Sequence, residues 1–161
     1  MSSICVGVVK IEDSNNELKK ALKKFVENRG WGIMFDTYYY PLAERIEGKN
    51  LTTFDLTDFP DYRNCERLLC EDWFTINEEK NKYPLVERLG FIKDVIRLCL
   101  KSVDNMEFYI GDFSTDIEEF LFYEIEWSEF VYTLMSLYNK YHDIPCVHFY
   151  IKNESNKTNK K

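Results

Sequence analysis

The stretch FLFYEIEWSEF (residues 120–130) changes its apolar period and so decides how this part of the chain folds. Up to Trp127 the side chains alternate, which is typical of a strand. One face of that strand carries Leu121, Tyr123, Ile125 and Trp127, and the other carries Phe122, Glu124 and Glu126 together with Phe120. From Ser128, the expected N-cap, the spacing is helical, with an apolar stripe formed by Phe130, Leu134, Leu137, Tyr138 and Tyr141. The pattern therefore predicts a strand that leads directly into a helix.

Further strands and helices are predicted on both sides of this stretch. Strands are expected at Met106–Gly111 and Cys146–Ile151, and earlier at Ile4–Ile11, Gly32–Tyr40 and Thr52–Leu56. Helical spacing follows a capping box at Ser14 and Glu17 and ends at Gly30, and it recurs at Asp61–Trp73 and from Pro84 to Lys101. We therefore expect a single α+β domain over residues 1–152, with a mixed or mostly antiparallel sheet packed against about three to four helices. Residues 153–161, rich in Lys and Asn, are expected to be a disordered tail.

The negative charge of the chain is concentrated in one window. The chain has 28 acidic and 21 basic side chains, a net charge of −7. Between Ser102 and Asn139 there is no Lys or Arg, but there are nine carboxylates, namely Asp104, Glu107, Asp112, Asp116, Glu118, Glu119, Glu124, Glu126 and Glu129. The rest of the chain carries a net charge of +2. A folded surface of one sign attracts partners of the opposite sign.

Composition restricts the classes of partner and compartment. An acidic chain is not expected to bind nucleic acid or an anionic membrane by charge attraction. No apolar run approaches the roughly 20 residues that span a bilayer. The five cysteines (Cys5, Cys65, Cys70, Cys99 and Cys146) are odd in number and match no disulfide framework, so we expect a cytoplasmic protein with reduced thiols.

No motif predicts a catalytic residue, a metal ligand set or a cofactor. His142, Cys146 and His148 form an H-x3-C-x-H cluster, but no second short-spaced set completes a tetrahedral zinc site. The phosphate-binding and nucleophile motifs are absent as well. Glu124 and Glu126 lie about 7 Å apart on one strand face, a spacing that also suits a small hydrolase with a carboxylate-lined cleft. We expect no enzyme, no cofactor and no metal, and keep the hydrolase as an alternative.

The acidic window also contains the predicted partner-binding residues. If the strands at 106–111 and 120–127 pair as a hairpin, their outer faces and the connecting loop share one surface formed by Glu107, Tyr109, Asp112, Asp116, Glu118, Glu119, Phe122, Glu124 and Glu126. Aromatic rings among carboxylates suit an interface with a basic protein. Two alternatives remain open, a solvated face that keeps the chain soluble and a helix that covers Phe122.

The segment from Met106–Gly111 through the run YEIEWSEF to the helix and the strand Cys146–Ile151 resembles the immunity proteins of bacterial polymorphic and contact-dependent growth inhibition toxin systems. The resemblance covers about a third of the chain and rests on overall style rather than on a signature motif. It implies an inhibitor that binds a cognate toxin domain, and many such toxins are basic nucleases. An adaptor that binds basic peptides is the competing interpretation, and the sequence gives no oligomeric state.

Overall fold

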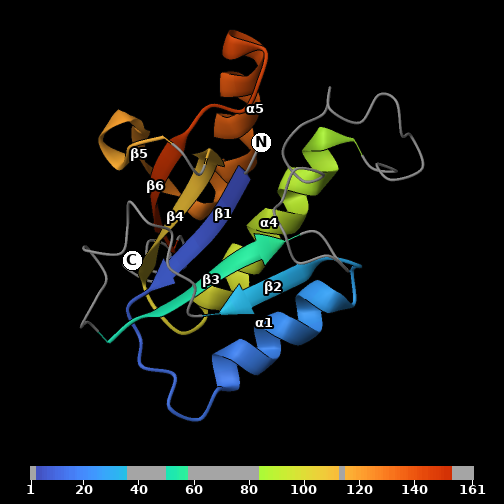
Figure 1. The fold of residues 1–161 in the computed structure, drawn as a ribbon, viewed down its shortest axis with the longest axis vertical. Coiled ribbons are helices and arrows are strands. Elements are labelled where there is room, and N and C mark those ends of the chain that lie inside the picture. Colours follow the sequence, from blue (N-terminus) through green and yellow to red (C-terminus); the bar gives the residue numbers. More distant parts are fainter. Residues whose placement is uncertain (1–2, 36–49, 58–83, 113–114, 154–161) are drawn as a thin grey trace, which may run out of the picture.

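The fold is built on a six-stranded sheet that carries three α-helices within the described ranges (Figure 1). This computed structural model describes residues 3–35, 50–57, 84–112 and 115–153. The strands are β1 (Ser3–Val9), β2 (Gly32–Phe35), β3 (Thr52–Thr57), β4 (Asn105–Asp112), β5 (Leu121–Glu126) and β6 (Val147–Lys152). The helices are α1 (Glu17–Glu27), α4 (Leu85–Leu100) and α5 (Phe130–Tyr141), and short 3-10 helices η3 (Ile117–Glu119) and η4 (Trp127–Glu129) flank β5.

The predicted fold class is confirmed. The chain forms an α+β domain, and among the described strands all pairs are antiparallel except that of β5 with β6. The strands expected at 4–11, 52–56, 106–111, 120–127 and 146–151 are present to within a few residues. The predicted helix at Asp61–Trp73, the residues Cys65 and Cys70, the end of the strand predicted after Phe35 and the tail beyond Asn153 lie outside the described residues.

The predicted hairpin between the strands at 106–111 and 120–127 is wrong. The strand order is β2-β3-β1-β4-β6-β5, so β6 lies between β4 and β5. β6 pairs antiparallel with β4 and parallel with β5. The physical reason is the connection: parallel neighbours need a crossover of a dozen or more residues, and η4 and α5 supply it between β5 and β6. β5 is consequently an edge strand of the described sheet.

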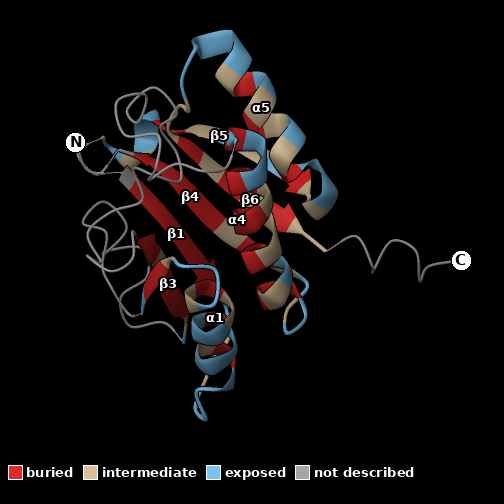
Figure 2. Ribbon diagram, turned by 90° about the vertical axis from the view of Figure 1, so that its right-hand side faces the viewer, coloured by how far each residue is buried: buried red, intermediate tan, exposed pale blue. Residues whose placement is uncertain are grey.

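One face of the sheet packs against the three helices and forms the main core. Figure 2 shows α1, α4 and α5 on the same side of the sheet. The strand register places a row of aromatic residues on this face, and only Gly7 interrupts it: Phe35, Phe54, Gly7, Phe108, Phe149 and Tyr123. The rings of Phe54 and Phe108 lie 6.3 Å apart across that glycine. Five of the chain's 26 aromatic residues thus form one row beneath the helices.

The opposite face of the sheet holds a second, smaller buried cluster. Its members are Ile4, Val6, Val8, Tyr109 and Phe120. The register row through this cluster runs across all six strands and contains Met34, Asp55, Val6, Tyr109, His148 and Phe122. The row ends at the exposed ring of Phe122 on β5. The predicted site residues on β4 and β5 therefore share a face, although their strands are not neighbours.

Helix α4 is the central core helix, as its apolar pattern predicts. It begins after Pro84 and buries residues along nearly its whole length, among them Leu89, Ile92, Val95, Ile96 and Cys99. With 16 residues, it is the longest of the described helices. No helix in the described ranges is both long and apolar enough to cross a membrane.

Helix α1 is capped by a residue other than the predicted one. The capping box at Ser14 and Glu17 is wrong, because the carboxylate of Asp13 accepts hydrogen bonds from the backbone N–H groups of Leu18 (3.2 Å) and Lys19 (2.9 Å). Asn16 occupies the N-cap position in the left-handed conformation, φ +58°, and its side chain makes no capping bond. At the other end the prediction is confirmed, since Gly30 adopts φ +82° just beyond the helix.

Replacing Asp13 by alanine is expected to lower the free energy of unfolding by about 1 kcal/mol, because two N–H groups of the first turn lose their acceptor. Urea unfolding followed by circular dichroism measures this. The matched control is Ser14→Ala, at the neighbouring exposed position, which is expected to change stability by less than about 0.5 kcal/mol. A larger loss for Ser14→Ala than for Asp13→Ala would contradict the assignment.

Candidate functional site

The predicted partner-binding residues fall into two groups. Glu107 and Tyr109 lie on β4, inside the sheet, whereas the others lie on η3 and β5 at its edge or at the end of β4. The side chain of Asp112 lies outside what the structure describes, although its backbone pairs with Ser3 at the end of β4. The intervening strand β6 brings His148 between the two groups.

The β4 residues form a compact polar cluster with His148. Oε1 of Glu107 accepts a hydrogen bond from the Tyr109 hydroxyl (2.9 Å) and lies 2.7 Å from Nε2 of His148. The imidazole stacks on the Tyr109 ring, with 4.1 Å between centroids and 14° between planes. Tyr109 is only 2% exposed, so its ring supports the surface from beneath rather than forming it.

This cluster orients an imidazole but lacks a described nucleophile. A carboxylate that holds one imidazole nitrogen is half of a catalytic triad, and the other half is a hydroxyl or thiol within hydrogen-bond reach of the second nitrogen. The hydrogen bond described for His148 goes to Glu107. Cys146, the residue directly before β6, packs against the second cluster. The arrangement therefore acts as a rigid support for the side chain next to it, which is Phe122.

Phe122 is the large apolar side chain that β5 exposes. It is 59% exposed, and its ring meets His148 edge to face, at 5.0 Å between centroids and 70° between planes. The predicted alternative in which a helix covers Phe122 is wrong, because the helices pack on the other face of the sheet. An exposed ring fixed from below by an imidazole is a suitable anchor for a protein partner.

The two β5 carboxylates already have local roles. Glu124 is exposed, and its Oε2 lies 3.0 Å from Nζ of Lys152 on β6. The hydrogen bond and the charge of Glu124 raise the pKa of Lys152 above its ordinary value. Glu126 forms a capping box with Glu129, whose Oε1 accepts a hydrogen bond from the Glu126 backbone N–H at 2.8 Å. The expected N-cap at Ser128 is therefore wrong, because Glu126 and Glu129 cap the helical segment instead.

The acids before β5 face solvent. Asp116, Glu118 and Glu119 are exposed on and next to η3. Phe120, directly after them, is 7% exposed and packs edge to face on Tyr109 at 6.5 Å. This anchor fixes the direction of η3 and turns its carboxylates outward. We call η3, β5 and η4, with their carboxylates Asp116, Glu118, Glu119, Glu124, Glu126 and Glu129, the acidic edge.

Basic groups from other parts of the chain reach this region, which the sequence window does not reveal. Lys152 pairs with Glu124, as described above. On the helix side, Lys93 and Arg97 of α4 lie 4.4 and 5.1 Å from the Trp127 ring, and the indole Nε1 donates a hydrogen bond to the Lys93 carbonyl (2.9 Å). These contacts fasten the end of β5 to α4.

Helix α5 carries two exposed aromatic residues whose exposure the sequence did not predict. Tyr141, predicted in the apolar stripe, is 47% exposed, and Tyr132, not predicted as a site residue, is 76% exposed. Phe130, Leu134 and Leu137 of the stripe are buried as expected, and Tyr138 is partly buried against the same core. Tyr141 is the last residue of the helix, and the C-cap residue after it, His142, adopts φ +61°.

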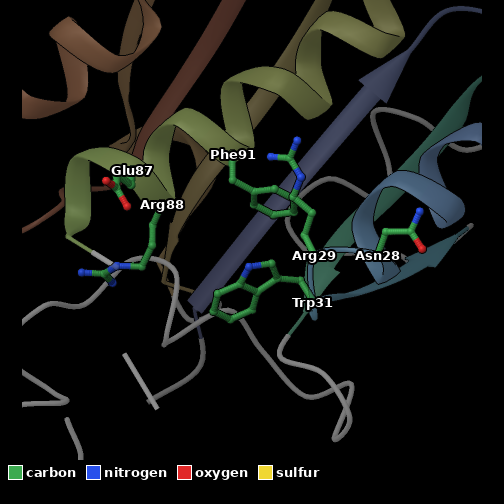
Figure 3. A pocket seen from close by; sticks show the side chains of 6 residues that line it. All are labelled: Asn28, Arg29, Trp31, Glu87, Arg88 and Phe91. Carbon is green, nitrogen blue, oxygen red and sulfur yellow. The ribbon is translucent and has the colours of Figure 1, made fainter. Parts of the chain in front are cut away.

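A cavity of about 440 Å³ lies elsewhere, between the end of α1 and the start of α4 (Figure 3). Its described lining comprises Asn28, Arg29, Trp31, Glu87, Arg88 and Phe91, none of which the sequence predicted as site residues. Arg29 lies 4.4 Å from the centre of the Phe25 ring and 3.9 Å from the Asp94 carboxylate. Figure 3 shows the side chains of Arg29 and Arg88 pointing in different directions, so their guanidinium groups do not converge on one point.

The described cysteines and histidines do not assemble a metal site. No group of three or more His, Cys, Asp or Glu side chains in the described ranges is placed to hold a metal ion. His142 is exposed at the end of α5, and His148 is engaged with Glu107. Cys5 and Cys99 are fully buried, and burial raises the pKa of the Cys99 thiol to about 12. Both residues thus behave as small core residues.

Comparisons of the chain with protein-family models, with curated proteins and with solved structures gave no match.

Proposed function

We propose that this protein is an immunity protein that binds and neutralises a cognate, basic toxin domain through its acidic edge. The observation that carries the proposal is the exposed ring of Phe122 on a strand flanked at both ends by carboxylates. An aromatic anchor supplies binding area, and surrounding charges steer a partner of opposite sign. The resemblance of the segment 106–151 to immunity proteins suggests the class of partner, with a nuclease-type toxin as the expected occupant.

The geometry supports binding more than catalysis. Glu124 and Glu126, the pair that a hydrolase would use, are occupied by Lys152 and by the cap of η4, respectively. Glu107 holds His148 within the sheet. By contrast, Glu118 and Glu119 are exposed on η3, a short distance before Phe122 in the chain. A prearranged surface of this kind loses little conformational entropy when a partner docks.

Co-expression tests the function directly. The toxin candidate is the C-terminal domain encoded by the gene immediately upstream of this chain's gene, produced in a bacterial host with and without this protein. We expect growth arrest by the domain alone and restored growth when the chain is present. A harmless upstream product, or arrest that the chain does not relieve, would refute the proposal.

Charge reversal tests the surface. The double change Glu118→Lys and Glu119→Lys is expected to slow association with the toxin domain about tenfold or more at low ionic strength, because like charges then meet across the interface. Stopped-flow measurement over a range of salt concentrations should show the difference shrinking as salt screens the charges. Thermal stability should change little, since both side chains are exposed.

The matched control is Glu12→Lys combined with Glu17→Lys. These residues are also exposed and give the same change in net charge. Glu17 is the first residue of α1 and Glu12 lies shortly before it in the chain, and α1 lies away from β5 (Figure 1). We expect the control to retain most of the association rate. Equal slowing by the two double variants would mean that overall charge, not the acidic edge, guides the partner.

A further inference from the structure

We propose that β5 binds its partner by strand addition, accepting an extended, lysine- or arginine-bearing strand along its outer edge. The inference deepens the proposed function, since it names the way in which the acidic edge would hold a partner. Strand addition uses the backbone N–H and C=O groups of β5 as well as its side chains. It therefore predicts different behaviour for residues whose backbone groups face outward and for their neighbours, whose groups face β6.

The ladder fixes which backbone groups of β5 face outward. The N–H of Leu121 donates to the Cys146 carbonyl (3.0 Å), and β5 runs parallel to β6 in a regular register. Successive residues of a strand direct their N–H and C=O groups to opposite edges, so Tyr123 and Ile125 also face β6. Phe122 and Glu124 face outward. The N–H of Glu126 confirms this alternation, because it turns outward to Oε1 of Glu129.

The outward groups of Phe122 and Glu124 have no described backbone partner, since β5 pairs only with β6 among the described strands. An edge of unpaired N–H and C=O groups is a template for another strand. Strand addition is also a recurring mode of peptide recognition, in which main-chain bonds give affinity and alternate side chains give specificity. The side chains of Phe122 and Glu124 project from the same face of this edge and would make those alternate contacts.

The carboxylates around β5 determine which kind of strand can pair with its outer edge. The side chain of Glu124 is 55% exposed, and the strand is bounded by exposed Glu118 and Glu119 at one end and by Glu129 at the other. A basic strand places cations opposite these groups. A second copy of this chain would place the same carboxylates against each other, which destabilises cross-strand pairs. The same charges guard the edge against self-association when no partner is present.

A proline substitution separates strand addition from docking through side chains alone. Glu124→Pro removes an outward N–H and leaves the β6 ladder intact, because the ladder uses the N–H groups of Tyr123 and Ile125. The residue before a proline favours the extended conformation, which Tyr123 already has. Glu124→Gln is the matched control, as it removes the same charge and the same pairing with Lys152 but keeps the N–H.

The probe is a short synthetic peptide of alternating lysine and valine, titrated into the full chain and followed by NMR. We expect Glu124→Pro to weaken binding at least tenfold relative to Glu124→Gln, and a matched glutamate–valine peptide not to bind. Equal binding by the two variants, equal binding of the two peptides, or no binding of the lysine–valine peptide to the unaltered chain would overturn the proposal.

Residue-resolved hydrogen exchange keeps the test decisive even if Glu124→Pro fails to fold. In the unaltered chain the amides of Phe122 and Glu124 should exchange fast, while those of Tyr123 and Ile125 are protected. Saturating lysine–valine peptide should slow the first pair. The proposal would be overturned if the amides of Phe122 and Glu124 were protected in the peptide-free chain, or if bound peptide left their exchange unchanged. If these amides became protected as the protein concentration rises, the occupant would be a second copy of the chain, which also contradicts the proposal.

The two proposals fail in different ways. If the toxin domain is neutralised but the Phe122 and Glu124 amides exchange as before in the complex, strand addition is refuted and the proposed function stands. If the basic peptide adds to β5 but the upstream domain is harmless, the inhibitor function is refuted and the edge remains a strand-binding site.

Discussion

Replacing Gly7 by alanine is expected to lower the free energy of unfolding by about 3 kcal/mol, a large effect for the addition of one methyl group. Gly7 is opposed by Phe54 on β3 and by Phe108 on β4. A Cβ at position 7 would lie 2.9 Å from Cε2 of Phe54 and closer still to two other atoms of the same ring. Phe54 is fully buried and packs on Phe108, so the ring has no room to move aside.

Chemical denaturation of the variants measures this. Gly90→Ala is the control, because it makes the same substitution in α4 where no atom lies within 4 Å of the new Cβ. Since alanine favours a helix over glycine, the control should gain up to about 1 kcal/mol. In addition, Phe54→Leu should cost less in the Gly7→Ala background than alone, because the shorter side chain makes room for the methyl group. A neutral Gly7→Ala variant would show that the aromatic row can shift.

Changing Asp55 to asparagine is expected to stabilise the protein strongly at pH 8 and only slightly at pH 4. Asp55 lies on the second face of the sheet between Met34 and Val6. Burial raises the pKa of its carboxyl from 3.8 to about 7, and the hydrogen bond from the Cys5 N–H (3.2 Å) opposes this only in part. The charged form is therefore disfavoured in the folded protein.

The sign follows from proton linkage. Between pH 3.8 and about 7 the folded chain holds a proton on Asp55 that the unfolded chain has released, so stability falls as the pH rises. The loss is about 1.4 kcal/mol per pH unit and ends near the folded pKa, with an upper limit of about 4 kcal/mol. Asparagine keeps the acceptor for Cys5 and carries no charge, which removes the loss.

Urea unfolding of Asp55→Asn and of the unaltered chain at pH 4, 6 and 8 checks this, and the quantity to compare is the difference in free energy at each pH. The exposed Asp116→Asn is the matched control and should give a nearly constant difference. A difference for Asp55→Asn that does not grow with pH would mean that water or a cation reaches the carboxylate.

Sequence periodicity predicted the elements well but not their pairing. Alternation in 106–111 and 120–127 gave both strands correctly, because burial of one face imposes a period of two. It did not predict that Tyr109 and Phe120, on the opposite face, are buried as well. The same alternation says nothing about which strand lies beside which. The connection through η4 and α5 is long enough for β5 and β6 to pair in parallel, and β6, not β5, lies beside β4.

The residues that cap α1 and η4 were also predicted wrongly, because the choice between neighbouring acceptors depends on the local backbone conformation. Ser14 and Asp13 are both suitable N-terminal acceptors by composition, and Asp13 takes the role because Asn16 turns through the left-handed region and aims that carboxylate at the helix. Ser128 was likewise expected to be the N-cap, but Glu126 and Glu129 form the capping box instead. They do so around the 3-10 helix η4, which the sequence did not predict.

The sequence indicated which carboxylates the candidate site contains, but not which of its residues are buried. The window without Lys or Arg identified the carboxylates of the acidic edge, and alternation along 120–127 placed Phe122 on the same face as Glu124 and Glu126. The burial of Tyr109 and the engagement of Glu107 depend on His148, which reaches them only because β6 is inserted between β4 and β5. For the same reason the pairing of Lys152 with Glu124 joins residues 28 positions apart, which no local pattern could indicate.

The insertion of β6 between two strands that precede it in the chain also sets an order of assembly during synthesis. A ribosome that has released β4, β5 and α5 has not yet released the strand that joins them. Until residues 147–152 emerge, a nascent chain can hold β5 through the helix beside it but not through the sheet. Completion of the edge that carries Phe122 is thus a late event, and a stalled or C-terminally clipped product that lacks β6 loses two strands from its sheet rather than one.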